Sequence, residues 1–155
     1  MSAPRARAVQ PIPPKLVASQ SIYNRDYASL AELAQERIIT YSKNSHPHQD
    51  VLSLMQANGV LAPRLNCVNS VSAITRLLRD GFGIGALPPV LVSEELARGE
   101  LVMLPMAQKL PNLQVVVSWR VGVELVEDIV ELCQRVVQRY GQKVGEDQLV
   151  LIAPQ

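Results

Sequence analysis

The chain has 155 residues, 48% of them hydrophobic, so it can bury the core of one domain and is too apolar for a disordered chain. Its 15 Lys and Arg residues against 14 Asp and Glu give a formal net charge of +1. This balance argues against a surface devoted to nucleic acid or to electrostatic membrane anchoring. The sequence shows no bilayer-spanning apolar run and no signal peptide, so we expect a cytoplasmic protein without a membrane partner.

The N-terminal third begins with an irregular stretch and continues with short elements. Residues 1–14 are rich in Ala, Arg and Pro without an apolar period, which predicts a flexible leader. KLVAS (15–19) predicts a strand. Ser29 and Glu32 have the capping-box spacing that opens a short helix. RIITYS (37–42), with β-branched and aromatic residues, predicts the next strand.

A helix and a third strand are predicted next. Pro47 suits a helix start, and apolar residues at helical spacing extend the helix to residue 58, with Gly59 as the stop. Residues 64–68 predict a strand. The inward side chains of the helix are expected to be Val51, Leu52, Leu54 and Met55.

The stretch from 68 to 92 predicts a helix, a buried strand and a second helix in direct succession. Asn69 and Ser70 are good N-cap residues for an apolar helical face that begins at Val71. Gly81 can take the left-handed conformation that ends a helix. The apolar run 82–87 predicts a buried strand, which Pro88-Pro89 stops, and Pro89 suits the first position of a helix.

The C-terminal third predicts two strands and two helices. Residues 93–98 complete a short helix closed by Gly99, and residues 101–104 and 115–119 predict strands, the second of them buried. The longest helix is predicted over 123–140, with Gly141 as its end and a polar tail over 142–155. Alternating strands and helices indicate an α/β fold with three layers, a mainly parallel sheet flanked by helices.

The Asn-Ser pair before an apolar helix, followed by DGFGIGALP and by ARGELVML, resembles the LysR-type transcriptional regulators. The resemblance implies that residues 15–141 are the second half of the effector-binding domain, its second lobe plus a return strand and helix, with a partial type 2 periplasmic binding protein fold. Nothing in the sequence resembles the family's winged helix-turn-helix or the first half of the effector domain. We therefore expect a truncated regulator that reaches DNA only through an N-terminal domain absent here.

Three strand ends form the candidate binding site. In open α/β sheets ligands bind at the carboxyl ends of strands, and helix N-termini there favour an anion. This rule predicts an effector site, most simply for a small carboxylate, at Ser42, Lys43, Asn69, Ser70, Leu87 and Pro88. The alternative is that Asn69 and Ser70 only cap a helix and that Lys43 is only a solvated loop residue. Family members use this helix start to touch effector, which the resemblance carries to Asn69 and Ser70.

Other chemistry is not supported by the residue patterns. His46 and His48 lack a third metal ligand at fitting spacing, so no metal site is expected. GFGIG lies within a strand and is no dinucleotide fingerprint, so no cofactor is expected. Cys67 has no His near it in sequence, and Cys67 and Cys133 are expected to be reduced, buried thiols. Without a nucleophile–base pair or paired carboxylates, no catalytic residue and no enzyme are predicted.

The longest helix carries two apolar rows. Leu125, Ile129, Leu132, Val136 and Tyr140 form one stripe, and Val126, Val130, Cys133 and Val137 widen it. Because the family's partner lobe is expected to be absent, we predict that the second row is exposed and packs in a homodimer. The leading functional hypothesis is a small-molecule sensor module of a transcriptional regulator. The alternative is a free-standing interaction or ligand-binding protein that oligomerises through its return segment.

Overall fold

The computed structural model describes residues 5–25, 29–61, 63–106, 108–120 and 124–144. The chain divides into two compact units, Pro14–Pro111 and the combination of Met1–Pro13 with Asn112–Gln155. The stretch that we predicted as one domain, 15–141, is therefore split between two units. Residues 1–4 of the predicted leader, residue 123 at the predicted helix start and residues 145–155 of the predicted tail lie outside the described residues.

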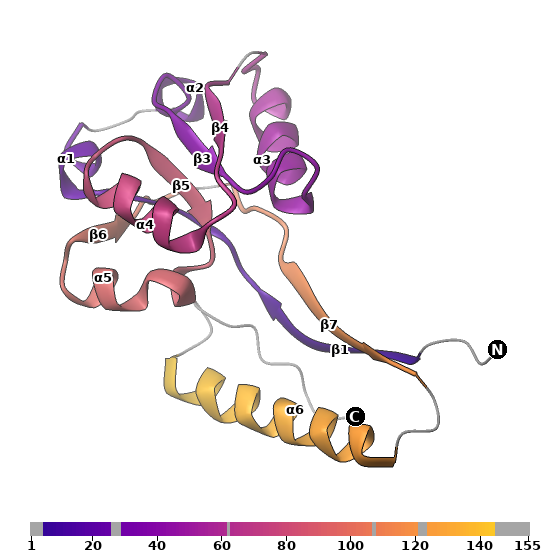
Figure 1. Ribbon diagram of the computed structural model, residues 1–155. Helices are drawn as coiled ribbons and strands as arrows, with labels where there is room; N and C mark the ends of the chain where they lie inside the picture. Colours follow the sequence, from indigo (N-terminus) through magenta and orange to yellow (C-terminus); the bar gives the residue numbers. More distant parts are fainter. Residues whose placement is uncertain (1–4, 26–28, 62, 107, 121–123, 145–155) are drawn as a thin grey trace. The chain divides into compact units, whose positions relative to one another are not determined.

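A five-stranded sheet forms the centre of the Pro14–Pro111 unit (Figure 1), in the order β4-β3-β5-β2-β6. Strand β3 pairs in parallel with both β4 and β5, whereas β2 is antiparallel to β5 and to β6. All strands except β2 thus run in one direction, which confirms the predicted mainly parallel sheet. The strands are β2 (Lys15–Ser19), β3 (Ile38–Thr40), β4 (Leu65–Cys67), β5 (Ile84–Leu87) and β6 (Leu101–Met103).

Helices cover both faces of this sheet, and two separate hydrophobic clusters mark the two interfaces. One cluster joins the sheet to α1 (Gln20–Tyr23), α2 (Leu30–Leu33) and α3 (His46–Ala57). The other joins it to α4 (Val71–Arg79) and the 3₁₀ turn η1 (Pro89–Val92), which leads into α5 (Ser93–Ala97). The predicted α/β fold with three layers is confirmed.

Side-chain alternation along the strands separates the two clusters. On β2, Leu16 and Ala18 enter the α3 side while Val17 enters the α4 side, and on β3 Ile38 and Ile39 divide in the same way. These residues are at most 2% exposed. Burial of apolar surface stabilises a fold by about 25 cal/mol per Å². Because both faces of this sheet are covered, this burial is the main interaction that holds the helices on the sheet.

Glycine fixes the approach of α4 to the sheet. A Cβ atom on Gly85 of β5 would lie 2.7 Å from a methyl carbon of Leu78 and 2.6 Å from one of Leu87. A side chain at residue 85 would therefore force the buried side chains of Leu78 and Leu87 to shift, and glycine lets α4 pack here without that change. Gly81, with φ of +70°, ends α4 as predicted, and Phe82 N then donates to Leu77 O.

The predicted helix caps are present. Ser29 Oγ accepts from Glu32 N at 3.2 Å at the start of α2, and Ser70 Oγ accepts from Ala73 N at 3.3 Å at the start of α4. Ser45, which we did not single out, caps α3 by accepting from His48 N at 3.4 Å. Each cap satisfies a first-turn N–H that has no partner within its helix.

The described residues of the other unit form a two-stranded antiparallel ribbon and one long helix. Strand β1 (Arg5–Ile12) pairs with β7 (Leu113–Trp119), and α6 (Glu124–Val144) packs against β1. Arg5 Nη1 lies 2.7 Å from Glu127 Oε1, and Arg7 Nη1 donates to Gln134 Oε1 at 3.5 Å. The prediction of a flexible leader is therefore wrong for residues 5–12. Their partner strand begins about a hundred residues later, so local composition did not reveal the pairing.

Two further predictions in this unit need correction. The strand over 115–119 is not buried, because Val115 and Val116 are 41% and 59% exposed in the two-stranded ribbon. Gly141 does not end the long helix, which continues to Val144. An interior glycine costs a helix only about 1 kcal/mol relative to alanine, and Gly141 is not among the glycines with positive φ.

The two apolar rows of α6 are exchanged relative to the prediction. Val130 is 2% exposed, and Val126 and Val137 are half-buried, so most of the predicted dimer row packs within the protein. Only Cys133 of that row is exposed. The outward row is the other one, with Leu125 at 68%, Ile129 at 49%, Leu132 at 56%, Val136 at 58% and Tyr140 at 40% exposure. None of the described helices is long and apolar enough to cross a membrane.

Candidate functional site

The three strand ends predicted to form the site do lie at one edge of the sheet. Strands β4, β3 and β5 are parallel neighbours, with Thr40 opposite Cys67 and Ile39 opposite Gly85. Their carboxyl ends therefore point the same way. This parallel register brings the segments 42–43, 69–70 and 87–88 to the same edge of the unit.

The antiparallel strand β2 adds a residue that the sequence reasoning missed. Because β2 runs against β5, its first residue, Lys15, pairs with Leu87, the last residue of β5. The edge thus carries a second lysine beside Lys43. A rule based on carboxyl ends could not find Lys15, since it begins its strand rather than ending it.

The predicted site residues differ in how much solvent they reach. Lys43, Asn69 and Ser70 are exposed, and Ser42 is partly exposed. Leu87 is 1% exposed within the α4-side core, and Pro88 is also buried. Leu87 and Pro88 therefore shape the edge through the backbone, and their side chains do not offer a contact surface.

Two helix N-termini open at this edge. Helix α3 begins after Ser45, whose hydroxyl donates to Ser42 O at 2.6 Å and so closes the turn that follows β3. Helix α4 begins after Ser70, whose hydroxyl also lies 2.9 Å from that of Ser72. The first-turn N–H groups and the partial positive charge at each helix N-terminus favour an anion. The positive charges of Lys15 and Lys43 favour an anion at the same edge.

A polar cluster that sequence spacing did not reveal lies between β3, α3 and β4. His48 Nδ1 is 2.8 Å from Thr40 Oγ1 and 3.5 Å from Cys67 Sγ. Thr40 and His48 are 1% and 5% exposed, whereas Cys67 is exposed. The expectation that Cys67 is buried is wrong. His48 is 19 residues away in sequence, and the pairing of β3 with β4 brings the two residues together in space. Cys133 is also exposed rather than buried, and both thiols are free.

Tyr41 follows this cluster and is packed beside the core on the α4 side. Its partial burial raises the pKa of the phenol above its usual value, because an anion there would lose hydration. The hydroxyl therefore stays protonated at neutral pH. Tyr41 thus presents a neutral hydroxyl directly after the last residue of β3.

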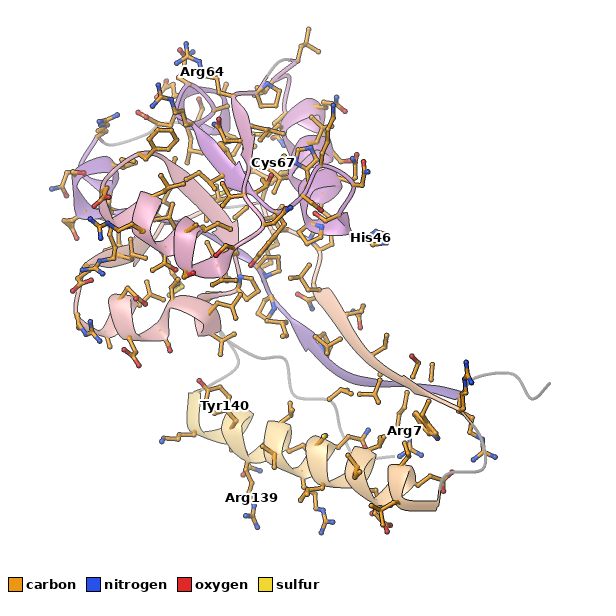
Figure 2. The ribbon with its side chains drawn as sticks, in the orientation of Figure 1. Arg7, His46, Arg64, Cys67, Arg139 and Tyr140 are labelled. Atoms are coloured by element: carbon orange, nitrogen blue, oxygen red, sulfur yellow. The ribbon has the colours of Figure 1, made fainter. Side chains whose placement is uncertain are left out.

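The two histidines are not arranged as metal ligands. His46 is exposed and projects from the start of α3 (Figure 2), whereas His48 is buried beside Thr40. Within the described part of the chain, no three His, Cys, Asp or Glu side chains gather closely enough to hold a metal ion. The cluster at His48 combines only one imidazole and one thiol with a hydroxyl.

A mainly parallel sheet with helix N-termini at one edge is the arrangement found here, and a known protein family matches the same residues. The model of the LysR substrate binding domain matches residues 4–140. The chain belongs to this family. The match includes β1, β7 and α6, so the segment that looked like a leader is part of the LysR substrate binding domain from residue 5 onward.

Solved structures of LysR-type regulators share the fold. The effector domain of the transcriptional regulator AmpR of Pseudomonas aeruginosa is 17% identical, with a TM-score of 0.65, over 92% of this chain and 71% of that one. The CcmR regulatory domain of Synechocystis, in complex with 2-PG, is 21% identical, with a TM-score of 0.68, over 86% and 66%. A sulfate-bound mutant of the OxyR2 regulatory domain of Vibrio vulnificus is 17% identical, with a TM-score of 0.64, over 88% and 66%.

Identities this low establish a common fold and do not establish that the ligand is shared. The chain spans about two thirds of the length of the CcmR and OxyR2 domains that it resembles. No curated protein sequence is similar enough to count as a relative. The periplasmic binding protein-like fold of LysR effector domains, expected from the DGFGIGALP stretch, is confirmed.

Proposed function

We propose that this chain is the part of a LysR-type transcriptional regulator that senses a small anionic effector, and that the effector binds at the carboxyl edge of β3, β4 and β5. The observation that carries the proposal is the convergence of two helix N-termini, at Ser45 and Ser70, on an edge with two lysines. The proposed contacts are Lys15, Ser42, Lys43, Asn69 and Ser70, with the backbone at Leu87 and Pro88.

The comparisons support the chemical class of the effector. One similar regulatory domain is described with sulfate bound and another with 2-PG. Sulfate is an anion of the size that two helix N-termini and a lysine can hold. A small carboxylate, phosphate or sulfate ester suits the same donors, and the chain's near-zero net charge means that such selectivity must come from this local arrangement.

The experiment is a thermal-shift screen of small carboxylates and phosphate esters against the whole chain. A ligand at 100 times its Kd stabilises the folded state by about 2.7 kcal/mol, so a binder raises Tm measurably. We expect Lys43→Gln and Asn69→Asp to reduce the ligand-induced shift. Lys109→Gln, at an exposed lysine between β6 and β7, is the control of matched charge and should leave the shift unchanged.

Ser70 separates a binding role from a capping role. Loss of either N-cap, Ser70→Ala or Ser29→Ala, should cost about 1 kcal/mol of stability, because each hydroxyl accepts from one first-turn N–H. Only Ser70→Ala should also weaken the response to ligand. If the two variants lose stability and keep the same ligand response, Ser70 is a cap alone. If no anion in the screen shifts Tm, the proposal of an anionic effector fails.

In this proposal the chain performs no catalysis and holds no cofactor. It acts in the cytoplasm as part of a complete regulator, which contacts DNA through a winged helix-turn-helix separate from the residues that match the LysR substrate binding domain. The solved relatives are regulatory or effector domains, which supports a sensing role over an enzymatic one.

A second candidate function, association through the return segment, is favoured by the outward row of α6. Four aliphatic side chains, Leu125, Ile129, Leu132 and Val136, are 49% to 68% exposed along one stripe. Soluble monomers rarely leave such a row in water. We propose that two copies of this chain pair through this outward row of α6. This surface takes the place of the row with Val130, which the sequence suggested as the dimer surface.

The oligomeric state tests this second proposal. Ile129→Lys and Leu132→Glu together should convert a dimer to a monomer in light scattering across a range of protein concentrations. Arg135→Glu on the exposed side of α6 is the control, since it changes charge and leaves the aliphatic row intact. A concentration-independent monomer for the unmodified chain would contradict the pairing.

A further inference from the structure

The Thr40–His48–Cys67 cluster is a nucleophile and a base brought together by the fold. Thr40 ends β3, Cys67 ends β4, and the parallel register sets them opposite each other. His48 lies in the first turn of α3 and reaches both, with Nδ1 at 2.8 Å from Thr40 Oγ1 and 3.5 Å from Cys67 Sγ. The hydroxyl and the thiol are themselves 4.0 Å apart.

Two residues of the cluster, Thr40 and His48, are buried, whereas the third, Cys67, is exposed, and this difference affects the reactivity of the thiol. Thr40 and His48 are among the few buried polar residues of the described chain, at 1% and 5% exposure, so solvent does not compete for the imidazole edge. Cys67 is exposed, so a reagent can reach it. A buried base behind an exposed thiol is the arrangement that activates cysteine nucleophiles.

The hydrogen bonds leave His48 Nδ1 able to accept from the thiol. In the tautomer that carries its proton on Nε2, Nδ1 has one lone pair. Thr40 Oγ1 has a second acceptor, Tyr41 O, at 3.4 Å. The Thr40 hydroxyl can therefore donate to Tyr41 O, which leaves His48 Nδ1 free to accept a hydrogen bond from the Cys67 thiol.

We propose that Cys67 is a site of thiol–disulfide exchange, with His48 as its base and a low-molecular-weight disulfide as the reagent. Cys67 Sγ gives its proton to His48 Nδ1 and attacks one sulfur of the disulfide. The new Sγ–S bond forms as the old S–S bond breaks, and the released thiolate takes the proton from His48. The product is a mixed disulfide on Cys67 and one free small thiol. This step does not depend on effector binding.

The second cysteine of the chain supplies a matched control. Cys133 is exposed on α6 and free, like Cys67, but it belongs to the other unit. In Cys133→Ser only Cys67 reacts, and in Cys67→Ser only Cys133 reacts. With dipyridyl disulfide, a neutral reagent whose released thiol is coloured, we expect Cys67 to react at least about 10-fold faster, a modest contribution for a general base.

Two further measurements separate activation from mere access. His48→Asn in the Cys133→Ser background keeps a polar group near Thr40 but removes the base, and it should lower the rate to that of Cys133. Circular dichroism checks that this variant folds. In urea, where the cluster is dispersed, the rates of the two thiols should become equal, so the comparison decides even if His48→Asn does not fold.

Equal rates for the two cysteines in the folded chain would overturn the proposal. So would a folded His48→Asn variant that reacts as fast as its parent, since that would make His48 a packing residue only. Mass spectrometry of the unmodified chain should place the first equivalent of mixed disulfide on Cys67, and its appearance on Cys133 first would also contradict the assignment.

Discussion

Gly83 shows how one residue can set the spacing of two strands. It precedes β5, and a Cβ atom there would lie 2.2 Å from the carbonyl oxygen of Arg37, which accepts from Ile84 N at 2.8 Å. Because the obstacle is backbone, no side chain can move aside. We predict that Gly83→Ala lowers the free energy of unfolding by at least about 1–3 kcal/mol, the usual cost of forcing extra atoms into a packed interior.

Gly59→Ala is the control for this prediction, and urea denaturation is the measurement. Gly59 has φ of +82° with open space around its missing Cβ, so alanine there meets only the left-handed backbone penalty, about 1 kcal/mol. A loss at Gly83 no larger than that at Gly59 would mean that β3 and β5 can separate freely, contrary to the packing described.

Tyr41 makes stability depend on alkaline pH. Its pKa is raised in the folded chain by burial, and in the unfolded chain the phenol ionises near its usual value of about 10. The unfolded state therefore loses its proton first. The stability contributed by Tyr41 is fully present below about pH 10 and is lost as pH rises through the folded-state pKa.

Tyr41→Phe checks this pH dependence. Urea unfolding of the parent and the variant above pH 10 should show a shallower loss of stability in the variant. Tyr23→Phe, at a tyrosine that is 41% exposed, is the comparison. Parallel pH profiles for the parent and Tyr41→Phe would show that burial of this phenol does not contribute to the alkaline loss.

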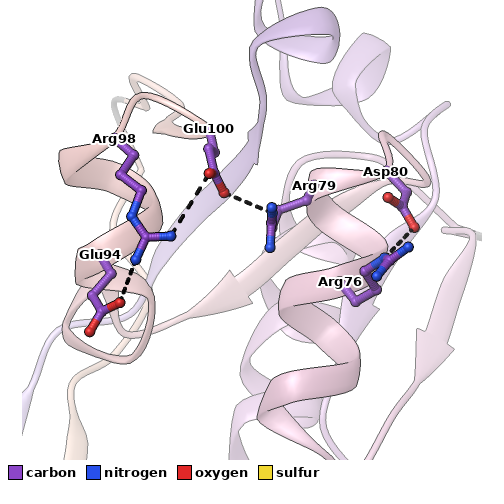
Figure 3. A network of polar contacts seen from close by, with 6 residues as sticks. All are labelled: Arg76, Arg79, Asp80, Glu94, Arg98 and Glu100. Carbon is purple, nitrogen blue, oxygen red and sulfur yellow. Dashed lines mark hydrogen bonds and ion pairs between the residues drawn. The ribbon is translucent and has the colours of Figure 1, made fainter.

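At the scale of elements, a charged network ties α4 to the turn between α5 and β6 (Figure 3). Arg79 Nε lies 2.8 Å from Glu100 Oε2, and Arg98 Nη1 lies 3.9 Å from the other oxygen. Glu100 Oε2 is buried, and no hydrogen bond of good geometry reaches it in the described structure. The contact with Arg79 is thus the main compensation for the lost hydration of that oxygen.

A double-mutant cycle measures this connection. We predict a coupling of about 0.5–1 kcal/mol between Arg79→Gln and Glu100→Gln, at the upper end for a partly exposed pair. The control is the Arg76–Asp80 pair of α4, 3.0 Å apart and 76% and 57% exposed, which should couple by no more than about 0.5 kcal/mol. Equal coupling in both cycles would show that Glu100 is as well hydrated as Asp80.

At the scale of the whole molecule, charge predicts how these 155 residues behave toward DNA. The formal net charge is +1, and the matched region is the LysR substrate binding domain. Non-specific DNA binding requires many lysine and arginine contacts to phosphate. We predict no sequence-dependent binding of duplex DNA by this chain in fluorescence anisotropy, and a salt-resistant preference for one sequence would contradict the prediction.

The sequence by itself determined the local elements and the family. Caps such as Ser29 and Ser70 and stops such as Gly81 depend on residues within one turn of each other, so spacing was enough to predict them. The alternation of helices and strands then predicted the parallel strands and their shared edge. The DGFGIGALP stretch and its neighbours indicated the LysR effector-domain fold.

Only the tertiary structure decided the pairings between distant residues. Whether 5–12 is a leader or a strand depends on a partner at 113–119, and which row of α6 is covered depends on its packing against β1. Lys15 reaches the site edge because β2 is antiparallel, and His48 meets Cys67 because β3 pairs with β4. These outcomes follow from strand direction, strand register and the packing of α6 on β1, which depend on residues far apart in the chain and leave no periodic signal in the local sequence.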